Sequence, residues 1–208
     1  MNKVDYKLYL VTDRDILKGR DLKKAVEESI LGGATLVQLR EKDVTTREFY
    51  DIAVDIKEVT DKYNVPLIIN DRIDIAQAID ADGVLVGQSD MPCDKARKIL
   101  GKDKIIGVSV HTLDEAIKAE NDGADYLGCG AVFSTSTKKD AIDVTYDCLK
   151  KIKENTKIPV VAIGGISDEN INKLKGTNID GVAIISAILA KDDIREATRK
   201  LKKNIPEK

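Results

Sequence analysis

The chain has 208 residues, of which 42% are hydrophobic and 34% are charged, a balance typical of soluble globular proteins. This length gives room for a large apolar core, so neither disulfides nor structural metals are needed for stability. Lys and Arg number 34 against 36 Asp and Glu, a net charge of −2 with the basic residues spread along the chain, so we expect no nucleic-acid partner.

The cysteines and the apolar runs indicate the compartment. Cys93, Cys129 and Cys148 are odd in number and widely spaced, which fits neither a disulfide framework nor a CxxC metal site. The apolar run before Thr12 is too short for the core of a signal peptide, and no run is long enough to cross a membrane. We therefore expect a cytoplasmic protein with no membrane partner.

Short apolar runs rich in β-branched residues alternate with longer charged, amphipathic stretches along the whole chain. Runs this apolar are typical of parallel strands that helices cover on both faces. They predict eight β/α units, with strands at residues 7–12, 36–40, 66–71, 83–87, 105–110, 126–131, 159–164 and 181–186.

Eight such units predict an α/β fold of one domain over residues 1–208, a (β/α)₈ TIM barrel. The alternative is an open, doubly wound sheet, but no GxGxxG follows the first strand, as a dinucleotide-binding half would require. Helix starts are predicted at Thr112, with Glu115 in the capping-box position, and at Ser167.

In a barrel of this kind, reactive groups gather at the carboxyl ends of the strands. Gly164 and Gly165 end the seventh strand, and Ser186 leads directly from the eighth strand into an apolar stretch. Backbone N–H groups at these two points predict a phosphate site. The alternative is that the glycines only turn the chain and that Ser186 is only a helix cap.

Two carboxylates, Asp71 and Asp90, follow neighbouring strands and are expected side by side at the same end of the barrel. They predict a Mg²⁺ site, because Mg²⁺ takes one or two carboxylates together with water and substrate phosphates. Arg40, Lys42 and Lys138 favour this interpretation, since cations would also neutralise a polyphosphate. Alternatively, each Asp caps a helix or a turn.

The loop 134–138 follows the sixth strand and is dense in hydroxyl groups. Its Lys138 is expected to bind a phosphate as a point charge rather than to form a Schiff base. His111, two residues after Ser109, is the only histidine, which leaves little basis for a histidine metal site or a Ser-His-Asp triad. For His111 we expect a capping or structural role, with proton transfer as the alternative.

The predicted site therefore has a monophosphate position at strands 7 and 8 and a metal-bound polyphosphate position at strands 2, 3, 4 and 6. No strong general base stands between them. This layout suits loss of a diphosphate leaving group, with capture by a second, phosphorylated substrate.

Several motifs in this order resemble the thiamine phosphate synthase family, and the resemblance covers nearly the whole chain. They are YLVTD (9–13), QLREK (38–42), INDR (69–72), GQSD (87–90), GVSVH (107–111), FSTSTK (133–138), IGGI (163–166) and VAIISAI (182–188). The resemblance implies a (β/α)₈ barrel that joins 4-amino-2-methyl-5-hydroxymethylpyrimidine diphosphate to 4-methyl-5-hydroxyethylthiazole phosphate. The products would be thiamine phosphate and diphosphate.

The resemblance also implies a role for each motif residue. Asp71 and Asp90 would bind Mg²⁺, and diphosphate would depart before the thiazole nitrogen captures a pyrimidinylmethyl cation. Lys138, Ser109 and Arg40 are the implied catalytic residues. The residues implied to contact the pyrimidine diphosphate are Gln38, Arg40, Lys42, Asn70, Ser109 and Lys138. Those implied for the thiazole phosphate are Thr135, Thr137, Gly165, Ile185 and Ser186.

Two positions depart from the family pattern. Leu85 stands where a histidine is common, and Thr145 stands where a glycine is common. Two alternative functions remain: a thiazole tautomerase of the same lineage, which would need His111 as acid or base, and a non-catalytic barrel that binds a phosphorylated ligand. The sequence leaves the choice between monomer and homo-oligomer open.

Overall fold

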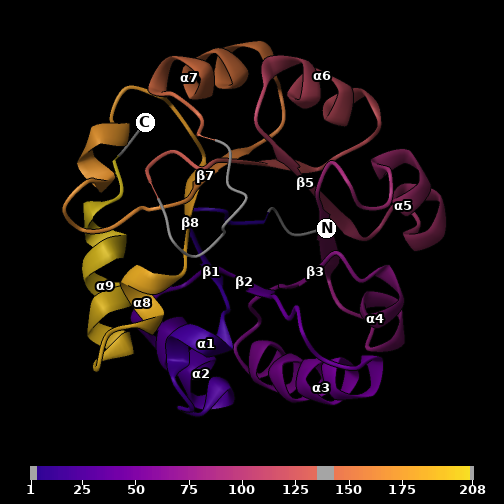
Figure 1. Ribbon diagram of the computed structural model, residues 1–208, viewed down its shortest axis with the longest axis vertical. Coiled ribbons are helices and arrows are strands. Elements are labelled where there is room, and N and C mark those ends of the chain that lie inside the picture. The colour runs from indigo at the N-terminus through magenta and orange to yellow at the C-terminus, as the bar shows by residue number, and fades with distance from the viewer. Residues whose placement is uncertain (1–3, 135–142, 207–208) are drawn as a thin grey trace.

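The eight strands form one closed parallel barrel in the computed structural model, which describes residues 4–134 and 143–206 (Figure 1). The predicted (β/α)₈ TIM barrel is confirmed, and the open-sheet alternative is wrong because β8 pairs with β1. The strands are β1 (Leu8–Val11), β2 (Leu36–Leu39), β3 (Leu67–Asn70), β4 (Gly83–Val86), β5 (Ile105–Val110), β6 (Tyr126–Cys129), β7 (Val160–Ile163) and β8 (Gly181–Ile184).

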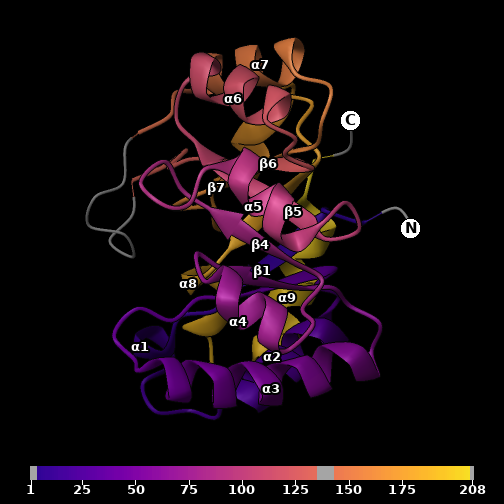
Figure 2. The same cartoon turned by 90° about the vertical axis from the view of Figure 1, so that its right-hand side faces the viewer.

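Helices surround the barrel on the outside, as Figures 1 and 2 show. None of those described is long and apolar enough to cross a membrane. Their bounds are α1 (Arg14–Leu17), α2 (Leu22–Gly32), α3 (Thr46–Lys62), α4 (Ile73–Ala78), α5 (Cys93–Leu100), α6 (Leu113–Asn121), α7 (Tyr146–Asn155), α8 (Ser186–Leu189) and α9 (Ile194–Asn204), with a short 3₁₀ helix, η1 (Ile171–Leu174).

The strands are buried on both faces and separate two apolar clusters. Side chains alternate between the two faces of a strand, so each strand contributes to both clusters. The larger cluster lies between strands and helices. The smaller one fills the inside of the barrel and consists of Tyr6, Tyr9, Val11, Leu36, Ile68, Leu85, Ile105, Tyr126, Val161 and Ala183.

Side-chain caps start several of the helices. The predicted cap at Thr112 is confirmed, because its hydroxyl accepts a hydrogen bond from the Glu115 amide at 3.2 Å. The Glu115 carboxylate reaches back and accepts from the His111 amide at 2.7 Å. Thr145 caps α7 in the same way, because its side chain accepts a hydrogen bond from the Cys148 amide. These caps satisfy backbone N–H groups that the first helical turn leaves free.

The helix predicted to start at Ser167 is wrong. A turn follows instead, and only η1 forms before the chain reaches Gly176. Within this turn the Asn170 amide oxygen accepts from the Ser167 N–H at 2.8 Å, and its amide nitrogen donates to the Gly165 carbonyl at 2.8 Å.

Candidate active site

The two predicted metal ligands lie together at the carboxyl end of the barrel. Asp71 directly follows β3, and Asp90 follows the neighbouring β4. They are close enough for the negative charge of Asp90 to raise the pKa of Asp71. Asn70 donates from Nδ2 to Asp71 Oδ2 at 2.6 Å, and the Gly87 amide donates to Asp90 Oδ2 at 2.8 Å. The barrel thus places two acidic side chains near each other, and each accepts a hydrogen bond from a residue close to it in the sequence.

The environment of Asp71 opposes its ionisation. Asp71 is exposed as a residue, but desolvation of its carboxylate, together with the negative charge of Asp90, raises its pKa to about 6. Arg40 and the Asn70 amide act in the opposite direction. The backbone of Asp71 is left-handed, with φ at 60°, a conformation that Asp and Asn tolerate better than most residues. Such an environment is favourable for a cation.

Gln38 and Asn70 are buried at the ends of β2 and β3, with 2% and 9% of their surface exposed. Gln38 donates from Nε2 to Tyr9 Oη at 2.9 Å. Tyr9 belongs to the cluster inside the barrel, so Gln38 sits on top of that cluster. The predicted polar site is thus continuous with the barrel interior.

Crossed ion pairs connect the ends of β1 and β2. Arg40 Nη1 lies 3.5 Å from Asp13 Oδ2, and Arg14 Nε lies 2.9 Å from Glu41 Oε2. Burial raises the pKa of Glu41, and Arg14 opposes that shift. Among the described residues, Glu41 Oε1 is buried without a hydrogen-bond partner. These pairs hold Arg40 close to the barrel mouth.

Ser109 is half-buried on β5, and its carbonyl accepts from Gln88 Nε2 at 2.7 Å. Leu85 is buried in the interior cluster. A Cβ placed on Gly128 would lie 3.7 Å from Leu85 Cδ1 and 4.0 Å from Ser109 Oγ, so the two side chains face the same space. Position 85 therefore places an apolar group close to Ser109.

The predicted phosphate residues lie at the ends of β7 and β8. Gly165 has a φ of 63°, and an added Cβ would lie 2.5 Å from the Ser134 carbonyl oxygen. This close approach gives the glycine a structural reason of its own, which leaves the phosphate prediction open. Ser186 is exposed and is the first residue of α8, while Ile185 is the cap residue; the alternative that Ser186 is the cap is therefore wrong.

Both the backbone and the imidazole ring of His111 contact the Glu115 carboxylate. Its backbone N–H donates to Glu115 Oε2, and its Nδ1 lies 3.3 Å from the same oxygen. The His111 carbonyl also accepts from Cys148 Sγ at 3.6 Å. These contacts agree with the predicted structural role at the start of α6.

The remaining predicted site residues differ in what the structure says of them. Lys42 is exposed in the loop after β2. Thr135, Thr137 and Lys138 lie outside the described residues. Their predicted roles stay predictions.

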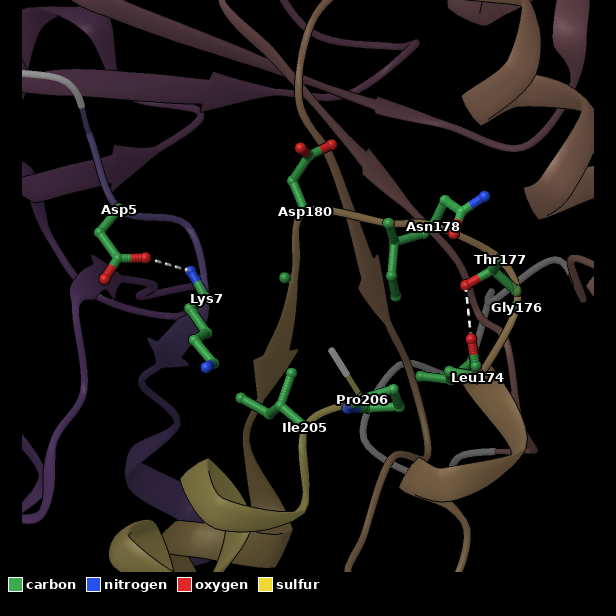
Figure 3. A pocket seen from close by; sticks show the side chains of 11 residues that line it. Asp5, Lys7, Leu174, Gly176, Thr177, Asn178, Asp180, Ile205 and Pro206 are labelled. Carbon is green, nitrogen blue, oxygen red and sulfur yellow. Dashed lines mark hydrogen bonds between the residues drawn. The ribbon is translucent and has the colours of Figure 1, made fainter. Parts of the chain in front are cut away.

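A cavity of about 290 Å³ lies at the opposite end of the barrel, by the amino ends of β1 and β8 (Figure 3). Lys7, Asp180 and Ile205 are among the residues that line it. Asp180 accepts hydrogen bonds from Lys153 Nζ at 2.7 Å and from the Val160 amide at 2.8 Å. No predicted site residue lines this cavity. It is therefore separate from the carboxyl-end site.

A smaller cavity of about 160 Å³ reaches the predicted site itself. Gln88 and Asp90 lie at one part of its lining, and Lys118 and Asp122 on α6 and just after it line another. Lys118 and Asp122 form an ion pair with each other. The space next to Asp90 therefore extends between α5 and α6.

The sequence analysis missed two residues that contact predicted site residues, because Tyr9 bonds Gln38 and Asp13 pairs with Arg40. It named Asn70 as a site residue but did not predict its bond to Asp71. Asp13 had a usable signal, because it follows β1 as Arg40 follows β2. Tyr9 had a weaker one, a hydroxyl within an otherwise aliphatic strand. The contact between Asn70 and Asp71 could not be read from their adjacency alone.

Comparisons with known proteins agree about this chain. The family model described as thiamine monophosphate synthase matches residues 8–188. Thiamine-phosphate synthase of Clostridium tetani is 62% identical over 198 residues, which cover 95% of this chain and 95% of that protein. The enzyme of the same name from Alkaliphilus oremlandii is 61% identical over 202 residues and 97% of each chain.

Solved structures give the same result. Thiamine phosphate pyrophosphorylase from Pyrococcus furiosus superposes with a TM-score of 0.89 at 44% identity, over 96% of this chain and 95% of that one. The (S)-3-O-geranylgeranylglyceryl phosphate synthase of Thermoplasma acidophilum has a TM-score of 0.71 at 14% identity, over 97% of this chain and 93% of that one. This second likeness concerns the fold alone.

Proposed function

The chain belongs to the thiamine monophosphate synthase family, and from this premise we propose how its own residues bind two substrates and release diphosphate. It is an enzyme with thiamine-phosphate synthase activity, as its similarity to curated synthases over most of its length supports. Its substrates are therefore small molecules. The proposal concerns the reacting groups, the metal and the residue roles.

In the proposed reaction, 4-amino-2-methyl-5-hydroxymethylpyrimidine diphosphate is joined to 4-methyl-5-hydroxyethylthiazole phosphate. The bond between the pyrimidine methylene carbon and the diphosphate oxygen breaks first, and the electron pair leaves with the oxygen. The thiazole nitrogen then donates its lone pair to the resulting pyrimidinylmethyl cation. The products are thiamine phosphate and diphosphate.

The placement of Asp71 and Asp90 after the neighbouring strands β3 and β4, with the charge of Asp90 raising the pKa of Asp71, is the observation that carries this proposal. Two nearby carboxylates repel each other, and each offers only oxygen ligands, which is the donor type that Mg²⁺ prefers. No group of three or more His, Cys, Asp or Glu side chains that could hold a metal occurs among residues 4–134 and 143–206. A pair of carboxylates fits Mg²⁺, which fills its other positions with water and phosphate oxygens.

The cationic and polar residues around this pair would bind the diphosphate. Arg40, Lys42 and Lys138 supply positive charge, and Asn70 and Ser109 supply hydrogen-bond groups. Of these, Arg40, Ser109 and Lys138 are the proposed catalytic residues. Hydrogen-bond donors that contact the departing diphosphate oxygens stabilise the negative charge that develops on them in the transition state of the reaction. Bound Mg²⁺ would neutralise charge that develops on the leaving group. Gln38 would contact the pyrimidine ring.

The thiazole phosphate would bind on the other side of the mouth. Gly165, Ile185 and Ser186 are the proposed phosphate residues, at the ends of β7 and β8. Thr135 and Thr137 are the proposed contacts for the rest of this substrate. No general base is required, because the thiazole nitrogen attacks with a free lone pair.

The first test measures diphosphate release by the purified protein with pyrimidine diphosphate, thiazole phosphate and Mg²⁺, omitting each component in turn. We expect release only when all three are present, with thiamine phosphate formed in equal amount. Absence of diphosphate from well-folded protein under every condition would rule out the proposed reaction. Tautomerase activity and plain ligand binding would be tested next.

The metal assignment has its own test in Asp90→Ala and Asp90→Asn. We expect Asp90→Ala to reduce turnover at least about 100-fold at limiting Mg²⁺, since metal stabilisation of a leaving group contributes several kcal/mol. Asp90→Asn keeps an oxygen that can accept from the Gly87 amide, so it controls for the local fold. Unchanged turnover in Asp90→Ala would contradict the metal role.

A further inference from the structure

Three polar side chains form a hydrogen-bonded chain through the inside of the barrel. Tyr126 Oη lies 2.9 Å from Tyr9 Oη, and Tyr9 Oη accepts from Gln38 Nε2 at 2.9 Å. The three residues come from β6, β1 and β2, and none has more than 2% of its surface exposed. The chain begins deep in the apolar cluster and ends at a proposed substrate-binding residue.

A glycine on β5 leaves the space that these hydrogen-bonded side chains occupy. Gly107 on β5 is the register partner of Tyr126 on β6. A Cβ at Gly107 would lie 2.2 Å from Tyr126 Cζ and 2.5 Å from its hydroxyl oxygen. Any larger residue at 107 would therefore displace the phenol ring. Tyr6 packs on the other part of this ring, with the ring centroids 4.9 Å apart.

Packing alone does not account for the two hydroxyl groups. The surrounding cluster is aliphatic apart from its tyrosines, and phenylalanine rings would fill almost the same space. A buried hydroxyl is unfavourable unless it is hydrogen-bonded, so each hydroxyl here adds a polar requirement to an apolar core. Burial also raises the pKa of Tyr9 and Tyr126, which keeps both groups neutral and able to donate.

The hydrogen bond to Tyr9 limits what Gln38 can do. A terminal amide rotates readily between two orientations that exchange its oxygen and its nitrogen. Once Nε2 is engaged with Tyr9 Oη, the amide oxygen is the acceptor left for another partner. Since Tyr9 Oη accepts from Gln38, the Tyr9 proton is free to be donated to Tyr126 Oη, and this bond fixes the position of the Tyr9 hydroxyl. The Tyr9 hydroxyl, inside the barrel, thus selects one orientation of the Gln38 amide.

We infer that Tyr9 and Tyr126 are positioning residues that hold the Gln38 amide in one orientation, with its oxygen available as the acceptor for the pyrimidine substrate. This inference rests on the proposed function, in which Gln38 contacts the pyrimidine ring. The two tyrosines act through Gln38 and do not touch the reacting atoms. Their effect is confined to one of the two substrates.

The kinetic test uses Tyr9→Phe and Tyr126→Phe, with Tyr6→Phe as the matched control. Tyr6 belongs to the same cluster, but its hydroxyl is not part of the hydrogen-bonded chain. We expect Tyr9→Phe to raise KM for the pyrimidine diphosphate about three- to tenfold, the usual effect of one lost hydrogen bond, and Tyr126→Phe to raise it less. KM for the thiazole phosphate should stay unchanged in all three variants.

A double-mutant cycle tests whether the tyrosine acts through Gln38. In a Gln38→Met background, Tyr9→Phe should have no further effect on KM for the pyrimidine diphosphate, because the group that it positions is absent. Full additivity would overturn the inference. So would equal increases in both KM values or no change in Tyr9→Phe. If Tyr9→Phe does not fold, Tyr126→Phe serves in the same cycle, since it lies farther from Gln38.

A spectroscopic readout separates this inference from the proposed function. In nuclear magnetic resonance spectra, the side-chain amide signals of Gln38 should shift in Tyr9→Phe and stay in place in Tyr6→Phe, with no substrate present. If the wild type releases no diphosphate, the proposed function fails, whatever the amide signals show. If the wild type is active and these signals do not respond to Tyr9→Phe, only the positioning role fails.

Discussion

Asp71 shows how one residue can combine an unfavourable conformation with an unfavourable charge. Its backbone is left-handed, and the negative charge of Asp90 opposes ionisation of its carboxyl group. Each feature costs free energy in the folded protein, and neither improves packing. Sites that bind cations commonly accept such costs, because the ligand reverses the sign of the electrostatic term.

This environment predicts a pH dependence of stability in metal-free protein. The pKa of Asp71 is about 6 in the folded state, above its ordinary value of 3.8. Between these values the folded state binds more protons than the unfolded state, so this group makes stability fall as pH rises from about 4 to about 6. Asp71→Asn lacks this ionisation. Its melting temperature should exceed that of the wild type more at pH 7 than at pH 4.

The measurement is thermal unfolding in a chelating buffer across this pH range. Asn is the suitable replacement because it also tolerates the left-handed backbone. Asp51→Asn, at an exposed position on α3, is the control and should follow the wild type at every pH. A melting difference for Asp71→Asn that does not vary with pH would contradict the electrostatic explanation.

His111 gives a second prediction at this scale. Its contacts to Glu115 are those of a residue that stabilises the start of α6. We expect His111→Ala to lower turnover less than about tenfold, because loss of a general acid or base typically costs about 100- to 10,000-fold. Steady-state kinetics at saturating substrates would measure the effect. A collapse of activity as large as that of Asp90→Ala would instead support proton transfer by His111.

At the scale of elements, the β/α units differ in what stabilises their helices. Asp21, Thr45, Thr112, Thr145 and Asp193 cap longer helices by accepting a backbone N–H. The segment after β7 has no such cap and forms only η1. Short connections suffice there because Gly165 lets the chain pass within contact of Ser134. Capping alone does not set helix length, because Asp13 caps the four-residue α1 while the eight-residue α5 has no side-chain cap.

The cap of α9 provides a stability prediction. The Asp193 carboxylate accepts from the Glu196 amide at 2.8 Å, and α9 packs against α2. Asp193→Ala should lower the free energy of unfolding by about 1 kcal/mol, the usual cost of losing a cap. Urea unfolding measures this loss. Asp193→Asn should retain most of the stability, and kcat should be the same in all three proteins because this cap lies outside the proposed site.

At the scale of the whole molecule, the closed barrel links every strand to two neighbours. Because β8 pairs with β1, no strand of the barrel is an edge. Loss of packing at one point therefore weakens the entire ring. Unfolding should be a single cooperative transition for the helix layer and the barrel interior alike.

Phe49→Ala tests this cooperativity. Phe49 lies on α3 with 1% of its surface exposed, so its truncation should cost about 3–5 kcal/mol. The chain has no tryptophan, so tyrosine fluorescence reports on tyrosines such as Tyr9 and Tyr126 in the barrel interior. In Phe49→Ala, the unfolding midpoint measured by tyrosine fluorescence should fall together with the midpoint measured by far-ultraviolet circular dichroism. Ile117→Ala, at a position 39% exposed, should change either midpoint little.

The number, order and type of the strands could be predicted from the amino-acid sequence alone. Eight apolar runs gave eight parallel strands, and the strand ends differ from the structure by at most two residues. Runs of this kind are readable because burial on both faces demands apolar residues at successive positions. Because Asp71 and Asp90 follow neighbouring strands that are predicted to be parallel, both could be assigned to the same end of the barrel from the sequence.

The contacts between side chains across the barrel could not be predicted in this way, because they depend on how the folded strands are placed. Residues 9, 38 and 126 are far apart in the chain, and their hydrogen bonds depend on closure of the ring and on the register of β5 with β6. The structure also decided the segment after Ser167, where the expected helix is replaced by a turn and η1. Periodicity reports burial, whereas contacts between distant polar groups depend on distances that only the folded chain defines.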